Sequence, residues 1–466
     1  MSAESTGQPR GMRAFTIVWA GQLVSLLGTN MTGFALPIYI YGQTERVREL
    51  ALLGLAFTLP LILLSPFSGA IVDRANRKLM MMISDLAAGL MTIVILILVL
   101  TDSLQIWHLF VTAVVSGTFQ SFQWPAYSAA ISVMLPKKHY ARAHGMISLA
   151  QSGSNIFAPL LAGAVLGVAG LRLVLLIDIV TFLFAIGSLA LVHIPTPPPS
   201  EEGQEGAGSL WSEAAYGFRY IWRRPSLLGL QTVFLVGNFL VSLSYTTVAA
   251  MILARTNQNE LLFGTVQSAG AVGGVAGALL MSAWGGPKRL IHGVLGGWFV
   301  SSLLGPMLLG IGQGLPVWAA ASFFAGFFIP IINGSNQAIW QAKVAPDIQG
   351  RVFSIRRLIA WLVNPVATLL AIPLADNILE PAMQPGGALV EQLSWLVGSG
   401  PGAGMALIFI GSGILASLAG LSGYLIPAIR NVETILPDHA LAQESDTQDR
   451  VAGEEMSAAP EGAGLD

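Results

Sequence analysis

The sequence contains no cysteine, and only 10% of its 466 residues are charged. The absence of cysteine excludes disulfides and thiolate metal sites. Soluble domains carry roughly 25% charged residues, so this chain has too few to cover a soluble surface. Hydrophobic residues instead make up 54% of the chain and form long runs, such as 86–100 and 171–192. Runs of about 20 residues match a hydrocarbon core of about 30 Å, which predicts an all-α membrane protein.

Sequence motifs of the common catalytic sites are also missing. The chain has no phosphate-binding G-x-x-x-x-G-K-[S/T] loop, no H-E-x-x-H metal pair and no G-x-S-x-G nucleophile turn. We therefore expect no enzyme, no cofactor and no metal site. A permease subunit that is powered by a separate ATPase stays open as an alternative function.

Twelve membrane spans are expected from the apolar runs, with both ends of the chain on one side. If residues 1–12 are placed inside, only four of the 23 Lys and Arg residues fall on outer loops, namely Arg46, Arg48, Arg172 and Arg255. Positive charge accumulates on the cytoplasmic side of membrane proteins. This predicts a multi-pass protein with both termini in the cytoplasm. The expected spans are 14–41, 50–72, 79–100, 106–134, 142–168, 172–194, 226–253, 261–284, 289–312, 316–343, 351–375 and 404–429.

A polar linker divides the chain into two halves of six spans each. The expected divisions are a cytoplasmic tail 1–12, a six-helix bundle 13–194, a cytoplasmic linker 195–225, a second bundle 226–430 and a disordered acidic tail 431–466. Within the linker, 211–224 is expected to form an amphipathic helix on the membrane surface. The outer stretch 376–402 is rich in Gly and Pro and is expected to cap an exit path.

Landmarks recur between the halves at offsets of 206–211 residues. The matched pairs are Asn30 with Asn238, Arg77-Lys78 with Lys288-Arg289, Pro136 with Pro346, Arg142 with Arg351, and Pro159 with Pro365. Each pair is weak evidence alone, because amides and prolines are common. Together they predict two parallel six-helix repeats, which is one of the known transporter architectures.

The loop GAIVDRANRK at 69–78 resembles the signature loop of the major facilitator superfamily. Further segments are similar to its drug-efflux subgroup of macrolide exporters and enterobactin-type siderophore exporters: WAGQLVSLLGTNMTGFALPIYIY at 19–41, Ser84-Asp85, QWPAYSAA at 123–130, Leu176-Ile-Asp178 with Thr181-Phe182, and Gly350-Arg351-Val-Phe-Ser354. The resemblance implies two pseudo-symmetric six-helix bundles in a bacterial inner membrane. It also implies export of drugs, macrolides, siderophores or other secondary metabolites by alternating access.

Proton antiport is implied by the resemblance and not by a residue pattern. Many proton-driven exporters of the superfamily carry an arginine in span four, but span four here contains no Arg or Lys. The expected partners are a small-molecule substrate, protons and the lipid bilayer, with no nucleic acid, and the protein is expected to act as a monomer. Import of a small organic solute stays open, because architecture does not fix direction.

Five residues of the signature loop are expected to form a conformational latch between the halves: Gly69, Asp73, Arg74, Arg77 and Lys78. Gly69 permits close backbone approach, and Asp73 suits the amino terminus of a neighbouring helix. Arg77 is expected to pair with such a carboxylate. The alternative is that the basic residues only set the membrane topology.

Two carboxylates within spans are candidate proton sites, Asp178 and Asp85. A charged group near the bilayer centre is costly, so such a residue must face protein or water. Asp178 could instead accept structural hydrogen bonds near an interface. Asp85 could form an ion pair with Arg77, Arg356 or Arg357.

The family's central cavity is lined by spans one, four, seven and ten, with contributions from five, eight and eleven. In this chain those spans carry amides and aromatics, which suit a bulky, amphipathic and weakly charged molecule. The alternative is that these amides bind helix to helix. The expected cavity residues are Gln22, Asn30, Gln120, Gln123, Trp124, Tyr127, Gln151, Asn155, Asn238, Tyr245, Gln267, Asn333, Asn336, Gln337, Trp340 and Asn364.

Overall fold

The computed structural model describes residues 11–44, 47–197, 208–257 and 259–438, and this part of the chain contains helices but no strands. Ten helical stretches in it are long and apolar enough to cross a membrane. One of them, Lys137–Leu191, is broken at Gly170 into two passes. Helix α4 (Ile106–Met134) falls below the hydropathy of these ten stretches, but its 29 residues are long enough to span, and with it the described residues make twelve passes.

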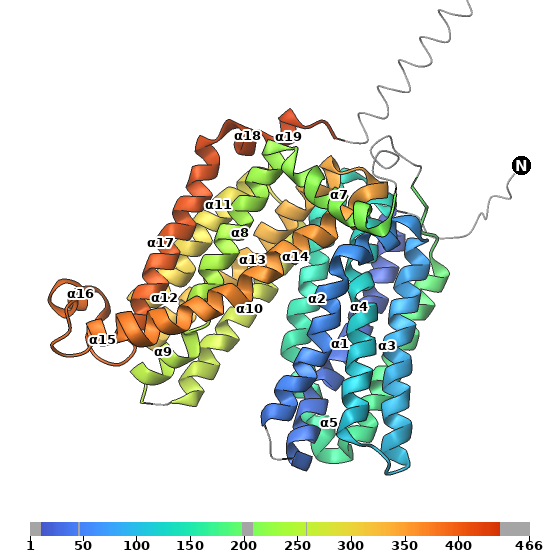
Figure 1. Ribbon diagram of the computed structural model, residues 1–466, viewed down its shortest axis with the longest axis horizontal. Helices are drawn as coiled ribbons and strands as arrows, with labels where there is room; N and C mark the ends of the chain where they lie inside the picture. Colours follow the sequence, from blue (N-terminus) through green and yellow to red (C-terminus); the bar gives the residue numbers. More distant parts are fainter. Residues whose placement is uncertain (1–10, 45–46, 198–207, 258, 439–466) are drawn as a thin grey trace, which may run out of the picture.

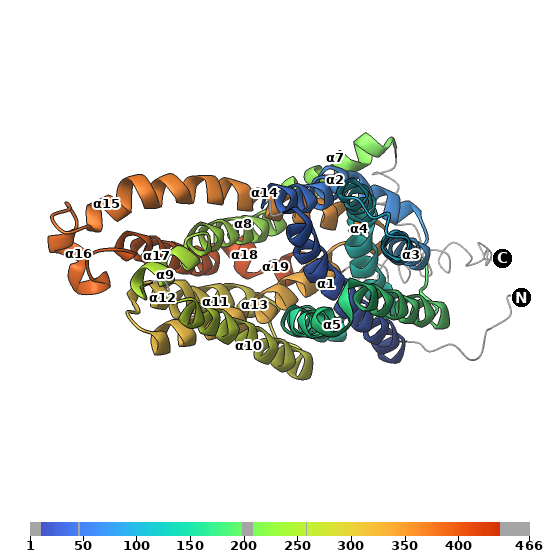
Figure 2. The same cartoon turned by 90° about the horizontal axis from the view of Figure 1, so that it is seen from below.

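The helices form two bundles that lie side by side (Figure 1). The first bundle consists of α1 (Gly11–Thr44), α2 (Val47–Arg74), α3 (Arg77–Leu100), α4 and α5 (Tyr140–Leu191). The second contains α8 (Pro225–Tyr245), α9 (Val248–Arg255), α10 (Glu260–Trp284), α11 (Leu290–Ser302), α12 (Leu308–Ile311), α13 (Leu315–Lys343), α14 (Gln349–Pro373) and α17 (Ala403–Leu425). Seen from below, α10 and α14 lie on the side of the second bundle that faces the first (Figure 2).

Helix α7 (Leu210–Trp222) marks one end of the molecule, which we call the linker end; the opposite end is the far end. The turn between α2 and α3 and the start of α14 also lie at the linker end. The bundles approach one another there and diverge towards the far end (Figure 1). Contacts between them join α2 to α14 and α5 to α10.

Local sequence explains where several helices begin or turn. Asn76 caps α3, because its side chain accepts a hydrogen bond from the Leu79 N–H at 3.2 Å. Gly170 takes a φ of +67°, a value that L side chains rarely adopt, and there α5 reverses direction. Pro136 and Pro346 each precede or begin a short 3₁₀ turn, η1 (Lys137–His139) and η3 (Pro346–Ile348). These two turns occupy matching places in the bundles, as the sequence repeat predicts.

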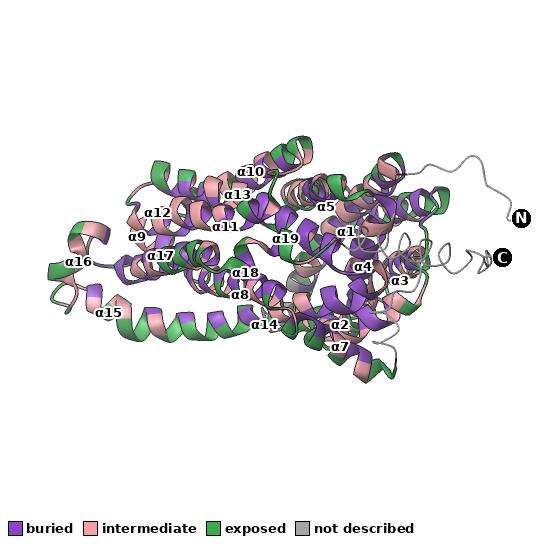
Figure 3. Ribbon diagram, turned by 90° about the horizontal axis from the view of Figure 1, so that it is seen from above, coloured by how far each residue is buried: buried purple, intermediate pink, exposed green. Residues whose placement is uncertain are grey.

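Apolar side chains cover the outside of the bundles as well as their cores. Figure 3 shows exposed residues along the outward side of α14, where Leu362, Val366 and Leu369 are more than half exposed. A water-soluble protein would not expose such a continuous apolar stripe. The surface therefore suits lipid, and the interior is filled by residues such as Phe15, Trp318 and Phe353.

Several expected boundaries change. The seventh span is interrupted between Tyr245 and Val248, so it comprises α8 and α9. The tail expected to be disordered from residue 431 contains α19 (Val432–Ile435), and Val432 is fully buried against the second bundle, so residues 431–438 are ordered. The expectations for residues 1–10, 198–207 and 439–466 lie outside the described residues.

The amphipathic helix expected in the linker is α7. It packs against α2 of the first bundle and α14 of the second. The outer stretch contains η4 (Leu374–Leu379), α15 (Glu380–Met383) and α16 (Val390–Val397). In Figure 1 this stretch lies at the end of the second bundle that points away from the first. It packs on α12 and α17 and not over the space between the bundles, so the expected cap on an exit path is wrong.

Candidate functional site

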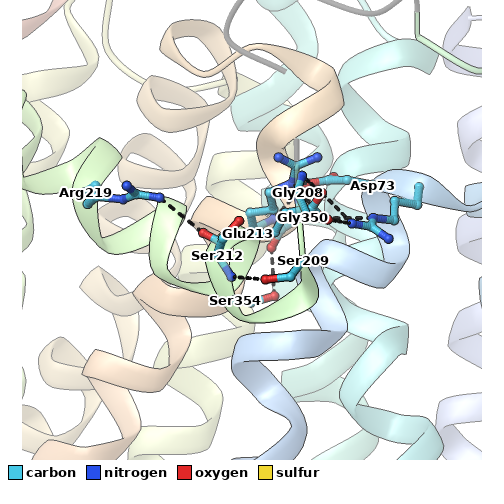
Figure 4. A network of polar contacts seen from close by, with 10 residues as sticks. Asp73, Gly208, Ser209, Ser212, Glu213, Arg219, Gly350 and Ser354 are labelled. Carbon is cyan, nitrogen blue, oxygen red and sulfur yellow. Dashed lines mark hydrogen bonds and ion pairs between the residues drawn. The ribbon is translucent and has the colours of Figure 1, made fainter. Parts of the chain in front are cut away.

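The carboxylate of Asp73 joins the two bundles at the linker end. Its Oδ1 accepts a hydrogen bond from the backbone N–H of Gly350 at 2.8 Å, and its Oδ2 accepts one from that of Arg351 at 2.9 Å (Figure 4). The side chain is 0% exposed. The first N–H groups of a helix have no partner within the helix and form the positive end of its dipole. Asp73 therefore caps α14 of the second bundle from α2 of the first.

A second carboxylate, Glu213 of α7, extends this contact to the linker. It accepts two hydrogen bonds from Arg74, at 3.0 Å from Nε and 2.7 Å from Nη2. Arg351 Nε lies 3.7 Å from Glu213 and 3.6 Å from Asp73. Charges of alternating sign thus connect α7, α2 and α14 (Figure 4). Sequence reasoning missed Glu213, because a single acid in the first turn of a helix is common.

Arg77 binds carbonyl oxygens. Its Nη1 donates to the carbonyl of Ala129 at 2.9 Å, and its Nη2 donates to that of Pro346 in the other bundle. The carboxylates of Asp73 and Asp347 act on Arg77 through their charge, whereas its described hydrogen bonds go to carbonyl oxygens. Arg77 nevertheless connects the bundles, because helix ends offer carbonyl groups that lack a partner within the helix.

The remaining two latch residues act through packing and capping. A Cβ on Gly69 would overlap the carbonyl group of Gly350, so these two helices touch backbone to backbone. Lys78 stays within its own bundle, where it donates to the carbonyl of Val192 at 2.9 Å, just beyond the end of α5. Of the five expected residues, Gly69, Asp73 and Arg77 thus contact the other bundle directly.

Two adjoining cavities lie among the helices that meet at this interface. One has a volume of about 410 Å³ and is enclosed by α8, α10, α11, α13 and the π-helical turn η2 (Leu303–Met307). The other has a volume of about 340 Å³ and lies between the bundles, with walls from α4, α5, α8, α13 and α14. We call them the apolar cavity and the inter-bundle cavity. Asn238 and Asn333 line both.

The comparisons with known proteins agree with this architecture. A sequence model with the description Major Facilitator Superfamily matches residues 18–368. The chain belongs to this superfamily. It is therefore a membrane transporter and not an enzyme.

Relatives within the superfamily include drug-efflux proteins. The chain is 25% identical over 381 residues to Macrolide efflux protein A of Streptococcus pyogenes, covering 78% of this chain and 90% of that protein. It is 27% identical over 366 residues to Multidrug efflux pump Tap of Mycolicibacterium fortuitum, covering 75% and 86%. The fold matches a bacterial homologue of the iron transporter ferroportin in its outward-facing state, with a TM-score of 0.62, 16% identity and coverage of 88% and 99%.

In this superfamily member, half of the expected cavity residues line a cavity. They are Trp124, Gln151, Asn238, Tyr245, Gln267, Asn333, Asn336 and Gln337. The others lie outside both cavities, namely Gln22, Asn30, Gln120, Gln123, Tyr127, Asn155, Trp340 and Asn364. Asn364, for example, accepts a hydrogen bond from Ser242 at 2.6 Å. Two residues that were not expected in the cavity, Arg356 and Arg357, line the inter-bundle cavity.

The two candidate proton sites are both enclosed in the first bundle. Asp178 accepts hydrogen bonds from Thr29, Thr32 and Thr92 at 2.9–3.2 Å, which joins α1, α3 and α5. The carboxylate of Asp178 thus has three hydroxyl donors in an otherwise apolar interior.

Asp85 accepts a hydrogen bond from Gln22 at 2.7 Å and another from Gln123 at 3.0 Å. Its described partners are thus amides, and the expected ion pair of Asp85 with an arginine is wrong. The same bonds explain why these two glutamines lie outside the cavities.

A carboxylate beyond the last span also joins the bundles, and sequence reasoning missed it. Asp438 lies 2.9 Å from Lys343 at the end of α13 and pairs with Lys137 of the first bundle. Burial acts to raise the pKa of Asp438, but the hydrogen bonds from Lys137 and Lys343 outweigh it and hold that pKa below its ordinary value. Lys343 also donates to the carbonyls of Glu433 and Leu436, which fixes the segment after α17.

Proposed function

We propose that the protein is a secondary active exporter of bulky amphipathic organic molecules, with the two adjoining cavities as its substrate site. The observation that carries this proposal is a cavity between two bundles whose linker end is held shut by charged contacts. The inter-bundle cavity takes its walls from both bundles, so its shape changes whenever the bundles rotate against each other. Alternating access at a site between repeats requires such an arrangement.

We assign the linker end to the cytoplasm of a bacterial cell and place the protein in the inner membrane. Basic residues gather at this end, including Arg74, Lys78, Lys137 and Lys343. Positive charge is retained on the cytoplasmic side of membrane proteins. With this orientation, the closed end faces the cytoplasm and the diverging end faces outward, and both termini are cytoplasmic.

Export is proposed because relatives that cover most of the chain carry the names macrolide efflux and multidrug efflux. The cavity lining supports a broad substrate range. Amides such as Asn238 and Asn333 accept and donate hydrogen bonds, while Trp298 and Tyr245 offer flat apolar contact. We propose protons as the coupling ion and Asp85 and Asp178 as the candidate carriers, because ionisable groups within spans are costly unless they have a function.

Everted membrane vesicles test direction and energy source together. Erythromycin is a suitable probe, and the expected result is accumulation inside everted vesicles on acidification of the lumen, above the passive accumulation of this weak base in vesicles that lack the protein. The accumulation should stop when a protonophore collapses the gradient and should not need ATP. Loss of accumulation only on removal of ATP would contradict the proposed secondary transport, and release from preloaded vesicles against the gradient would indicate import.

Two variants, Asp85→Asn and Asp178→Asn, test which of these two residues carries the proton. Asparagine keeps the size of the side chain but cannot gain or lose a proton at neutral pH. We expect substrate-driven proton flux to fall by at least about tenfold in the variant that removes the carrier, while substrate binding is retained. Unchanged proton flux in both variants would contradict the assignment of these two residues.

A further inference from the structure

Arg356 brings a positive charge into the wall of the inter-bundle cavity. It lies seven residues after the start of α14, about 10 Å along the helix axis. A charged side chain at such a position is costly in a bilayer and is retained where it has a partner or a function. Arg357, the next residue, also lines this cavity.

The Arg356 guanidinium is held in place by uncharged groups. It stacks over the ring of Trp340 at 4.1 Å and lies 5.5 Å from that of Phe353. Its Nη1 donates to the side-chain oxygen of Gln337 at 3.0 Å. Both aromatic rings are at most 2% exposed, so this support is rigid. The arginine is thus oriented by stacking and by one amide, and no described carboxylate forms an ion pair with it.

This arrangement leaves donor capacity unused. Arginine has five N–H donors in a planar fork, and the buried Nε of Arg356 has no hydrogen-bond partner among the described groups. A buried donor without a partner is unfavourable, so a movement of the guanidinium that brings this N–H to an acceptor on a ligand is favoured. The other described residues of the cavity wall include no Asp or Glu that could serve.

The apolar cavity next to it has the opposite character. Among its described lining residues there is no Lys, Arg, Asp or Glu, and its walls include Trp298, Ile329 and Ile332. Because Asn238 and Asn333 line both cavities, one molecule can occupy both. A ligand that fits the pair has an apolar body and one anionic end.

We propose that the site binds amphipathic organic anions, with a carboxylate on Arg356 and the apolar body in the apolar cavity. The fork of an arginine matches the two oxygens of a carboxylate, which makes such a contact strong and directional. This inference rests on the proposed function, because it names the substrate class of the same site. It also has a structural consequence: Gln337 donates to Ser128 of the first bundle at 2.8 Å, so an anion that draws Arg356 away from Gln337 loosens a contact between the bundles.

The test compares two probes of nearly equal shape, dansyl-leucine and dansyl-leucine amide. The first carries a carboxylate and the second a neutral amide. Binding of each to the purified protein in detergent is measured by dansyl fluorescence. We expect the wild-type protein to bind the acid at least about tenfold more tightly than the amide. This arm needs no variant, so it does not depend on whether a substitution folds.

Variants locate the preference. Arg356→Gln should bind acid and amide equally while keeping the amide affinity, and Arg356→Lys should show an intermediate preference because it keeps the charge but loses the fork. Arg430→Gln is the matched control, since this exposed arginine lies outside both cavities, and it should behave as the wild type. Equal wild-type affinity for both probes, binding of neither, or a preference retained in Arg356→Gln would overturn the proposal.

These binding measurements distinguish failure of the anion site from failure of the proposed export. Binding in detergent does not require movement across a membrane. A protein that prefers the acid but moves no substrate in vesicles would retain the anion site and lose the proposed function. A protein that exports erythromycin but binds both dansyl probes equally would retain the function and lose the anion site.

Discussion

Asp73 Oδ1 lies 2.8 Å from the backbone nitrogen of Gly350, and these two residues belong to different bundles. The contact places a negative charge at the start of α14, where the helix dipole is positive. The neighbouring N–H of Arg351 binds the other oxygen of the same carboxylate. One side chain thus satisfies two helix-terminal donors only while the linker end is closed.

Asp73→Asn should shift the protein towards opening of the linker end. The amide keeps one acceptor and presents N–H groups where the second acceptor is needed, so about 2 kcal/mol is lost, which is roughly thirtyfold in the opening equilibrium. The natural chain has no cysteine, so Ser148→Cys in the inter-bundle cavity gives a single reporter. Labelling by a membrane-impermeant maleimide from the linker end should rise in Asp73→Asn, and an unchanged rate would contradict the latch.

Gly69→Ala should have a similar effect through sterics alone. The added methyl group would overlap the backbone of Gly350, so α2 and α14 must separate. Gly163→Ala is the matched control, because a Cβ there meets no atom within 4 Å and alanine favours helix. We expect transport to fall at least about tenfold in the first variant and to be unchanged in the second. Equal transport in both would show that the helices tolerate the extra volume.

The two lysines that contact Asp438 should differ in their effect on stability. The side chain of Lys343 is 1% exposed, whereas that of Lys137 is 47% exposed. Asp438→Asn leaves the Lys343 charge buried without its carboxylate and should lower stability by roughly 1–3 kcal/mol. Lys137→Met removes a surface ion pair and should cost less than about 1 kcal/mol. Thermal unfolding in detergent measures both, and a larger loss in Lys137→Met would contradict this ranking.

The same carboxylate sets a pH dependence. Because the pKa of Asp438 is held below its ordinary value, its contribution to stability is complete above the unfolded pKa of about 4. The contribution is lost as the pH falls through the lower, folded value. The difference in unfolding temperature between wild type and Asp438→Asn should therefore be constant from pH 6 to 8 and should shrink only below about pH 4. A difference that shrinks near pH 7 would point to another titrating group.

Amide side chains in the cavities should control substrate preference. Asn238 lines both cavities, whereas Asn364 lies outside them and binds Ser242. Asn238→Ala should change the relative export of different drugs several-fold, because it removes a hydrogen bond that only some substrates use. Asn364→Ala should leave the relative export unchanged. Resistance profiles of cells that express each variant provide the measurement, and identical profiles for both variants would argue against the site.

The sequence predicted the twelve spans and the contact of Asp73 with the start of another helix because both depend on strong local signals. The length of an apolar run determines a span. A carboxylate in a short loop at the membrane surface is well suited to accept hydrogen bonds from the first N–H groups of a neighbouring helix. It could not predict the partners of Arg77, because these are backbone carbonyls, which every residue has. Asp438 was missed for a related reason: an acid in a polar tail has no distinguishing neighbour in the sequence.

The orientation of each helix about its axis was harder to predict than its ends. In a membrane protein, both the lipid-facing surface and the core are apolar, so periodicity does not show which face points inward. This explains why Gln22 and Gln123, expected in the cavity, bind Asp85 in the first bundle instead. It also explains why Arg356 was not recognised as part of the cavity wall.

The direct contact between the Gly69 and Gly350 backbones has a kinetic consequence. Side chains can change rotamer and so yield gradually, but two main chains in contact can only remain together or part. Solvent entering between them would break the hydrogen bonds of Asp73 at the same step. The exchange of closed and open forms should thus resemble a sharp two-state transition, with single molecules that dwell in either form and spend negligible time between them.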